Sequence, residues 1–213
     1  AICKRDNPFD ALISPQFKSL DALPKNAIIG TSSLRRQSQL LAYNPNLQVK
    51  TLRGNIHTRL SKLESGEYQA IILAAAGLER MGLAHHITQL IPDDIMLPTC
   101  AQGALCIECR TDDLEIQELI HGLNDPISAL CVHTERRVNA KLGGNCHIPF
   151  AVYCTITAEK LLLLRAKVLN LDGSQMIDDE QQGKIEEAEI IADRCTESLM
   201  TKGAMSLLST IPS

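Results

Sequence analysis

The sequence is poor in aromatic residues and has no long apolar run. Aromatic side chains make up only 3% of the 213 residues, and tryptophan is absent. Single-stranded nucleic acids are bound largely by stacking their bases on aromatic rings, so this composition disfavours a nucleic-acid-binding module. The longest apolar runs, such as residues 70–78, fall well short of the ~20 residues of a transmembrane helix, and no secretory signal is evident. We therefore expect neither a nucleic-acid nor a membrane partner.

Acidic residues are missing from one long part of the chain. Between residues 22 and 63 there are seven basic residues and no aspartate or glutamate, although the whole chain has a formal net charge of −4. This segregation indicates a local anionic ligand, although charge alone would fit a solvated basic face equally well. Neither a Walker A phosphate loop nor a Gly-x-Gly-x-x-Gly turn follows a strand, so a nucleotide is not indicated. Carboxylates are the favoured anions.

The eight cysteines show neither the spacing of a disulfide framework nor that of a metal site. Scattered cysteines in a chain of this size are typical of reduced thiols, so we predict a cytoplasmic location. Cys106 and Cys109 form a lone Cys-x-x-Cys, but on a strand they would point to opposite faces. We expect buried structural thiols there and no metal site. His85, His86 and His121 are expected at the surface or at helix ends.

Residues 30–37, Gly-Thr-Ser-Ser-Leu-Arg-Arg-Gln, are typical of a strand that ends in a tight turn and a helix N-terminus. The glycine would give the turn its backbone freedom, and Ser32 or Ser33 can cap the helix. Backbone N–H groups at the helix start then face outward beside two adjacent arginines. This stretch is predicted to bind an anion.

Three strand-to-helix units follow one another in the first half of the chain. The predicted strands are residues 27–29, 48–52 and 70–74, and the helices after the second and third are 56–64 and 78–81. This alternation predicts an α/β domain with a doubly wound, mainly parallel sheet, similar to a lobe of a periplasmic binding protein.

Ligands of such sheets bind beyond the carboxyl ends of the strands. Guanidinium groups placed there can hold carboxylates in bidentate fashion. One such arginine would be ordinary at the surface, but five at equivalent positions favour a site for several carboxylates. These are Arg35, Arg36, Arg53, Arg59 and Arg80.

The second half of the chain has a different pattern. After a loop at residues 92–98, a strand is predicted at 105–109. Asp125-Pro126 is a helix start, with a capping residue followed by proline, and Gly143 ends that helix. Its predicted buried face contains Ile127, Leu130, Cys131, Thr134, Val138 and Leu142.

Short turns join the next predicted strands, residues 150–157, 161–169 and 175–181, and a helix follows at 185–202. This predicts a small C-terminal α+β domain with a three-stranded antiparallel sheet. Between the two domains, Cys146 lies in a loop that Pro149 keeps out of helix and sheet, which favours an accessible thiol. The residues alone leave a structural role for this cysteine equally open.

Five motifs occur together and in the same order as in the porphobilinogen deaminases, also called hydroxymethylbilane synthases. The chain resembles this family along almost its whole length. The resemblance implies a cytosolic transferase of tetrapyrrole and haem biosynthesis, which condenses four porphobilinogen molecules into hydroxymethylbilane and releases ammonia at each step. The motifs are residues 30–37, 52–55 with 58–60, 74–78, 102–104 and 144–149.

The resemblance also implies a dipyrromethane cofactor, attached through a thioether to Cys146, which primes the growing oligopyrrole. A soft thiolate suits capture of an electrophilic methylene-pyrrole. The intact enzyme is expected to be monomeric. Cofactor contacts are expected from Arg35, Arg36, Ser33, Arg59 and Arg80. Substrate contacts are expected from Arg5, Arg53, Arg59, Arg80 and Gln102.

Two departures from the family pattern bear on these expectations. Asn145 stands where members commonly have glycine before the cysteine. The family's catalytic aspartate would lie before Ala1, so no catalytic residue is assigned, and we expect the isolated chain to be inactive. The expected divisions are 1–8 (end of an N-terminal domain), 9–100 (central anion-binding domain), 101–122 (a segment returning to the N-terminal domain) and 123–213 (cofactor-attachment domain).

The main alternative is a non-enzymatic lobe that binds small carboxylates or oxyanions. Such a lobe would share the architecture but would not need Cys146, so covalent modification separates the two hypotheses. A nucleic-acid-binding module built on the basic stretch predicts strongly salt-dependent binding to polyanions in general.

Overall fold

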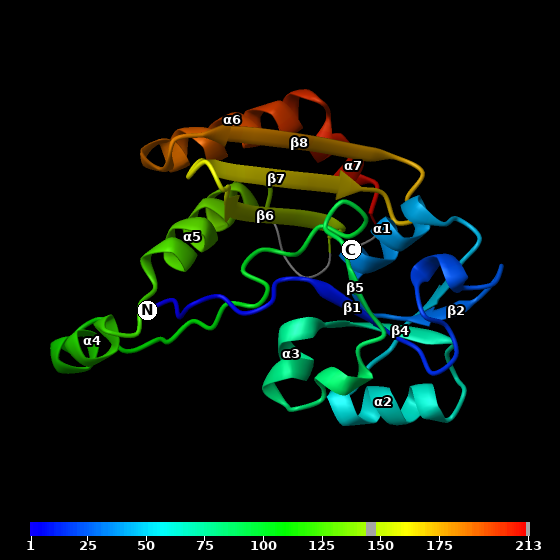
Figure 1. Cartoon of the computed structure of the whole chain (residues 1–213). Coiled ribbons are helices and arrows are strands. Elements are labelled where there is room, and N and C mark those ends of the chain that lie inside the picture. The colour runs from blue at the N-terminus through cyan, green and yellow to red at the C-terminus, as the bar shows by residue number, and fades with distance from the viewer. Residues whose placement is uncertain (144–147, 212–213) are drawn as a thin grey trace.

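A computed structural model of the chain describes residues 1–143 and 148–211. It contains two units, each with its own sheet (Figure 1). We call them the central unit, residues 9–98, and the C-terminal unit, residues 126–211. The segments 1–8 and 99–125 run beside each other and connect the two units. We call residues 99–125 the connecting segment.

The central sheet has five strands in the order β3-β2-β4-β1-β5. β2 is parallel to both of its neighbours, whereas β1 is antiparallel to β4 and β5. The predicted mainly parallel sheet is therefore wrong, and the sheet is mixed. Both β1 and β5 were missed: β1 begins with a buried aspartate, and β5 has a single buried residue, Ile91. The strands are β1 (Asp10–Ile13), β2 (Ile28–Gly30), β3 (Gln48–Lys50), β4 (Ala70–Ala74) and β5 (Gln89–Ile91).

Helices cover both faces of the central sheet because alternate strand residues point to opposite sides. Leu12 and Ile72 pack with Leu40 of α1 (Leu34–Tyr43) on one face. On the other face, neighbouring strand residues pack against α2 (Ile56–Glu64) and α3 (Ala75–Arg80). The predicted helix at residues 56–64 and the predicted strand at residues 70–74 are confirmed as α2 and β4 (Ala70–Ala74). Single-turn 3₁₀ helices lie at η1 (Leu20–Ala22) and η2 (Ala84–His86).

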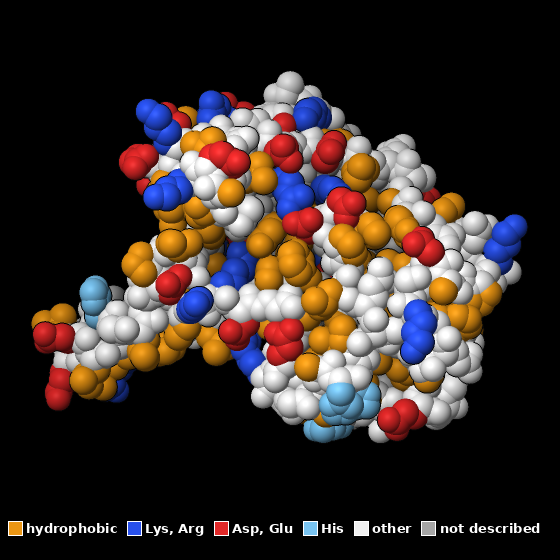
Figure 2. Space-filling model, viewed as in Figure 1, with side chains coloured by type: hydrophobic (Ala, Val, Ile, Leu, Met, Phe, Trp, Pro, Cys, Tyr) orange, Lys and Arg blue, Asp and Glu red, His pale blue; other side chains and the backbone are white. Residues whose placement is uncertain are grey.

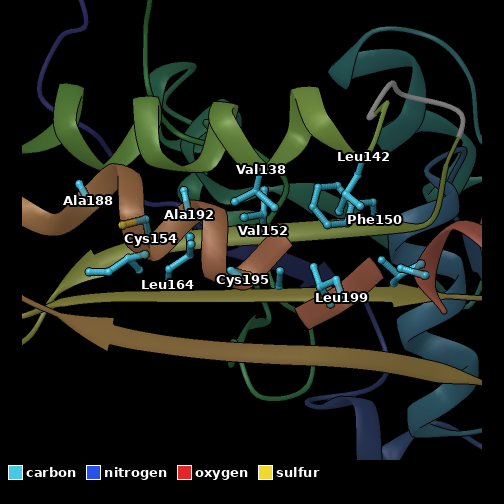
Figure 3. Close-up of a cluster of buried hydrophobic side chains, with 14 of the residues drawn as sticks. Val138, Leu142, Phe150, Val152, Cys154, Leu164, Ala188, Ala192, Cys195 and Leu199 are labelled. Atoms are coloured by element: carbon cyan, nitrogen blue, oxygen red, sulfur yellow. The ribbon is translucent and has the colours of Figure 1, made fainter. Parts of the chain in front are cut away.

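The C-terminal unit has the predicted three-stranded antiparallel sheet, in the order β6-β7-β8. Its core lies between this sheet and two helices, as Figure 3 shows for Val138, Val152, Leu164, Cys195 and Leu199. The elements are α5 (Pro126–Lys141), β6 (Phe150–Ile156), β7 (Leu162–Leu169), β8 (Met176–Gly183), η3 (Ile185–Glu187), α6 (Ala188–Thr201) and α7 (Ala204–Ser209).

The helix start at Asp125 is confirmed, since its side chain accepts a hydrogen bond of 2.8 Å from the Ser128 backbone N–H. Pro126 occupies the first turn. Ile127, however, is 60% exposed, so its place on the predicted buried face is wrong. It lies in the first turn, where α5 emerges from the connecting segment rather than packing on the sheet.

The connecting segment differs most from prediction. Residues 105–109 form no strand but make an isolated bridge between Ile2 and Cys106. The predicted burial of the Cys-x-x-Cys pair is also wrong, because Cys106 is exposed and Cys109 is half-buried. The helix α4 (Leu114–His121) was not predicted. It projects as an arm beside the N-terminus, with apolar side chains on its surface (Figures 1 and 2).

The seven cysteines within the described ranges are free thiols. Across the same ranges, no three histidine, cysteine or acidic side chains come together to hold a metal ion. His85 and His86 lie in η2, and His121 ends α4, as predicted. Within residues 1–143 and 148–211, no helix is both long and apolar enough to cross a bilayer.

Two sets of contacts fix the C-terminal unit on the central unit. Arg165 of β7 pairs with Asp93 in the loop after β5, and the nearby Val152 N–H donates to Pro98 O at 3.1 Å. Farther along, the β7–β8 turn packs on α1. There a Cβ on Gly173 would lie 2.3 Å from the backbone nitrogen of Ala42, so only glycine fits.

Candidate anion-binding cleft

A cleft of about 310 Å³ lies between the central unit and the C-terminal unit. The central unit contributes three arginines to one wall. The C-terminal unit contributes an apolar wall that includes Ile148 and the buried ring of Phe150. The lining residues are Ser32, Ser33, Arg35, Arg36, Arg59, Thr99, Gln102, Asn139, Ile148 and Phe150.

The turn between β2 and α1 brings the first two arginines to the cleft. Ser33 is the N-cap of α1, and its hydroxyl accepts from the Arg36 backbone N–H at 3.4 Å. Ser32 instead donates to Leu52 O at 2.6 Å, which fastens the turn to the segment after β3. Gly30 does not adopt a left-handed conformation, so the expected need for backbone freedom is wrong. Glycine is needed at position 30 because a larger side chain has no room: a Cβ there would lie 2.9 Å from the Tyr68 ring.

Arg35 is almost fully buried at the inner end of the cleft, with 4% of its side chain exposed. Its Nη1 donates to Asp10 Oδ2 at 2.7 Å and to Leu97 O at 2.8 Å. Its Nη2 donates to Gln102 Oε1 at 3.2 Å. The guanidinium group is thus held in one orientation by three internal acceptors.

Arg36 shares the same carboxylate. Its Nε donates to Asp10 Oδ1 at 2.9 Å, and its Nη2 forms an ion pair with the same oxygen at 2.8 Å. Burial lowers the pKa of Arg36, Asp10 raises it, and the neighbouring charges of Arg35 and Arg59 lower it further, with a net downward shift. Arg59 lies farther out, and its Nε donates to Gly54 O at 2.8 Å. The three guanidinium groups form a cationic cluster with one carboxylate beneath it.

Gln102 joins the cluster to the connecting segment. Its Nε2 donates to Pro8 O at 2.6 Å and to Asp10 Oδ1 at 3.1 Å, while its Oε1 accepts from Arg35. The predicted site residues Ser33, Arg35, Arg36, Arg59 and Gln102 therefore come together around one cleft.

The other three predicted arginines lie elsewhere among the described residues. Arg53 is exposed between β3 and α2. Arg80 pairs with Asp6 at 2.7 Å and donates to Gly103 O, also at 2.7 Å. Arg5 lies over the Tyr153 ring, 4.9 Å from its centroid, and pairs with Glu135. Substrate roles for these three stay predictions.

Glu135 of α5 joins three segments behind the cleft. Its carboxylate accepts from Arg5 Nη1 at 2.5 Å, from the Ala101 N–H at 2.7 Å and from the Cys154 N–H at 2.8 Å. Burial raises the pKa of this carboxyl and outweighs the lowering effect of Arg5 and the two backbone donors. The pair anchors residue 5 and the connecting segment to the C-terminal unit.

Ala1 lies away from the cleft, on the connecting segment. Its amino group donates to Ile107 O at 3.0 Å, and its carbonyl accepts from the Ile107 N–H at 2.9 Å. It borders a separate pocket with Cys109 and His121, and it is not among the residues that line the cleft. The expectation that the family's catalytic aspartate precedes Ala1 stays a prediction.

Comparison with known proteins assigns the chain to a family. The family model "Porphobilinogen deaminase, dipyromethane cofactor binding domain" matches residues 1–118, and "Porphobilinogen deaminase, C-terminal domain" matches residues 129–201. The chain belongs to the porphobilinogen deaminase family. The family, the enzyme class, the place in tetrapyrrole biosynthesis and the dipyrromethane cofactor predicted from the sequence are confirmed.

Porphobilinogen deaminases from two bacteria illustrate the similarity. That of Legionella pneumophila (strain Paris) is 99% identical over 213 residues, which is the whole of this chain and 69% of the relative. That of Nitrosomonas europaea is 46% identical over 211 residues, 99% of this chain and 68% of the relative.

The cleft fits a porphobilinogen-derived cofactor in its chemistry. A dipyrromethane has apolar rings and several carboxylates, and the cleft presents guanidinium groups opposite Ile148 and Phe150. Guanidinium groups bind carboxylates in bidentate fashion, while flat apolar rings favour an apolar wall. Cys146, the predicted attachment point, lies outside the described residues.

Several residues around the cleft escaped the sequence analysis. Asp10 and Glu135 were not singled out, and the apolar pattern gave no sign that Phe150 would border a cleft. A search for acidic residues within otherwise buried patterns would have found Asp10, because it precedes the apolar run Ala11–Ile13. Thr99 and Asn139 carried no comparable signal.

Proposed function

We propose that this chain supplies the carboxylate-binding cleft and the cofactor-attachment segment of a deaminase that condenses four porphobilinogen molecules into hydroxymethylbilane. The observation that carries the proposal is the cluster of Arg35, Arg36 and Arg59 facing the apolar wall of the cleft. Each pyrrole of the chain under synthesis brings two carboxylates, so a growing oligopyrrole needs several guanidinium groups.

Within the cleft, Arg35, Arg36, Arg59 and Ser33 would hold carboxylate groups of the ligand. Phe150 would pack against a pyrrole ring and keep water away from it. When bound, the dipyrromethane supplies the primer to which substrate pyrroles are added. A low-dielectric wall opposite the arginines strengthens their attraction for carboxylates relative to the same groups in water.

Attachment of the cofactor at Cys146 is part of the proposal. Its support comes from the described residues on either side: Asn139 precedes the cysteine on α5, Ile148 follows it, and both line the cleft. Two residues that line the cleft therefore flank Cys146 within nine positions of sequence. A thioether at this position would tether a primer beside the arginines.

Substrate contacts are proposed for Arg5, Arg53, Arg59, Arg80 and Gln102. Arg80 and Arg53 have partly or fully exposed side chains, so they are accessible to an incoming carboxylate. Arg80 would exchange its pairing with Asp6 for the ligand. Arg5 would act through the same edge of the connecting segment, since its Nε donates to the Gln102 carbonyl at 2.8 Å.

The proposed divisions are residues 1–8, 9–100, 101–122 and 123–213, with 101–122 returning to an N-terminal domain of the full-length family proteins. Support comes from α4, where Leu114 is 73% and Leu119 is 68% exposed. Side chains of this kind usually have a packing partner. We keep the periplasmic-binding-protein-like assignment of the central unit as a proposal, supported by Ser33 at the start of α1 and Arg59 of α2, which both line the cleft.

We further propose a monomeric enzyme in the cytoplasm without a nucleic-acid partner. Free thiols at the seven described cysteines support a reducing compartment. The pairing of Arg35 and Arg36 with Asp10, and of Arg80 with Asp6, argues against a basic face for nucleic acid. Such a face would present continuous cationic charge.

Calorimetric titration with a pyrrole that carries acetate and propionate but no aminomethyl group tests the cleft directly. We expect Arg36→Gln and Arg59→Gln each to weaken binding about tenfold, because each removes a charge-assisted contact. Arg110→Gln is the matched control, since the Arg110 side chain is 82% exposed on the connecting segment. Equal affinity in all four proteins would refute a carboxylate site in this cleft.

A further inference from the structure

Asp10 is a buried acid that none of the predicted roles includes. It is the first residue of β1, the antiparallel strand between β4 and β5, and its exposed fraction is 0%. Buried carboxylates are costly unless charged and polar partners surround them. The partners of Asp10 therefore indicate why it is present.

Those partners are the groups that form the cationic wall. Asp10 Oδ2 accepts from Arg35, and Oδ1 accepts from both Arg36 Nε and Gln102 Nε2, the last at 3.1 Å. The salt-bridge distances are 2.7 Å to Arg35 and 2.8 Å to Arg36. One carboxylate thus fixes two guanidinium groups whose like charges would otherwise push them apart.

Electrostatics in the cluster support this geometry. Burial would raise the pKa of Asp10, but Arg35, Arg36 and Gln102 hold it below its ordinary value, so the group stays ionised. Three arginines and one aspartate still leave an excess of two positive charges facing the cleft. Asp10 therefore orders the arginines without neutralising the site.

We propose that Asp10 is a positioning residue, which holds Arg35 and Arg36 in the orientation that binds the carboxylates of a pyrrole ligand. This rests on the proposed function of the cleft. Asp10 lies beneath the arginines and acts on the ligand only through them, while Gln102 links it to the connecting segment.

The proposal reverses the simplest electrostatic expectation. Removing a negative charge beneath an anion site raises its positive potential, so charge alone predicts tighter anion binding. Loss of orientation predicts weaker binding despite the added positive charge, because bidentate contacts depend on fixed guanidinium geometry. The sign of the change therefore separates the two effects.

The test is calorimetric titration of the full chain and of Asp10→Asn with the pyrrole that carries acetate and propionate but no aminomethyl group. Circular dichroism first establishes a temperature at which both proteins are folded. We expect binding by Asp10→Asn to be about tenfold weaker. The matched control is Asp193→Asn, because Asp193 of α6 also pairs with two basic side chains, Arg137 and Lys141 of α5, but in a partly exposed network.

A second variant covers the case in which Asp10→Asn does not fold. In the Arg35→Gln background the two adjacent positive charges no longer repel each other. We expect addition of Asp10→Asn to this background to weaken binding further, since Arg36 loses its anchor. Hydrogen exchange at the start of α1 should show faster exchange in the double variant.

Each outcome has a distinct meaning. Unchanged or tighter binding by folded Asp10→Asn, or no further loss in the Arg35→Gln background, would overturn the positioning role. If the unmodified chain itself fails to bind the pyrrole, the proposed function of the cleft fails instead. Weaker binding by Asp10→Asn with unchanged binding by Asp193→Asn supports the proposal.

Discussion

Asp10 and Glu135 are both fully shielded from solvent, but their carboxylates have different partners. Asp10 has two arginines and an amide, and its pKa lies below the ordinary value. Glu135 has one arginine and two backbone N–H donors, and burial raises its pKa. The second cation thus decides whether burial or charge pairing dominates. Asp10 lies beneath two arginines that line the cleft, and Glu135 joins the units.

Loss of the Glu135 carboxylate should have the largest effect on stability. In Glu135→Ala the charge of Arg5 and the N–H groups of Ala101 and Cys154 lose their acceptor. Removing one partner of a buried ion pair costs about 3–5 kcal/mol. Urea unfolding followed by circular dichroism measures the change.

Glu118→Ala on the exposed arm is the control for that measurement and should leave the unfolding free energy nearly unchanged. A loss in Glu135→Ala no greater than in this control would show that the buried pair contributes little to joining the units.

The second contact between the units is steric, and Gly173→Ala should disrupt it. A Cβ there would lie 2.5 Å from Ser38 O and 2.3 Å from Ala42 N, so α1 and the turn must separate. Gly66→Ala is the control, because Gly66 also has a positive φ, +82°, with nothing within 4 Å of its added Cβ. We expect Gly173→Ala to cost about 1–3 kcal/mol more than the control. Equal losses in urea unfolding would contradict the close contact.

The two buried carboxylates should also give opposite pH dependence. Asp10 titrates below its ordinary value of 3.8 in the folded state, so its stabilising contribution is present above that pH and is lost as the pH falls. Glu135 titrates above its ordinary value of 4.5, so the folded state binds its proton more tightly. Between 4.5 and the raised folded value, its contribution to stability decreases as the pH rises.

This difference can be measured as the change in unfolding free energy of Asp10→Asn and Glu135→Gln across the acidic range. The destabilisation by Glu135→Gln should shrink as the pH rises through that window. The destabilisation by Asp10→Asn should shrink only as the pH falls below 3.8. Parallel pH profiles for the two variants would refute the contrast.

The smallest effect is expected at an exposed ion network. Asp193 bonds Arg137 and Lys141, and these two basic groups lower its pKa. Because water and salt screen this network, Asp193→Asn should lose less stability than either buried variant. The loss should shrink further in concentrated sodium chloride. A salt-independent loss as large as that of Glu135→Ala would remove the distinction between buried and exposed networks.

Local patterns predicted much of this fold from the sequence. The spacing of apolar residues gave the bounds of α2 and β4, and the Asp125-Pro126 start and short turns gave α5 and the antiparallel sheet. Where the pattern was ambiguous, prediction failed. Residues 105–109 have strand-like composition but pair only through an isolated bridge, and α4 has no apolar face packed within the described residues.

The sequence predicted the arginines of the site but not the acidic side chains that pair with them. Arg35, Arg36 and Arg59 follow strand-to-helix turns, so topology brings them to one edge. Their pairing depends on contacts between distant positions: Asp10 and Arg35 are 25 residues apart, and Arg5 and Glu135 are 130 apart. No local periodicity carries that information, and only the assembled sheet and interface bring these groups together.

The most direct test is the intact mass of the full-length Legionella relative, with peptide mapping across the segment that corresponds to residues 143–149. We expect an addition equal to two linked pyrroles on the peptide that contains Cys146, and its loss in Cys146→Ser. This result would place the primer beside the arginine cluster. An addition on a different peptide, or one that persists in Cys146→Ser, would contradict attachment at this cleft.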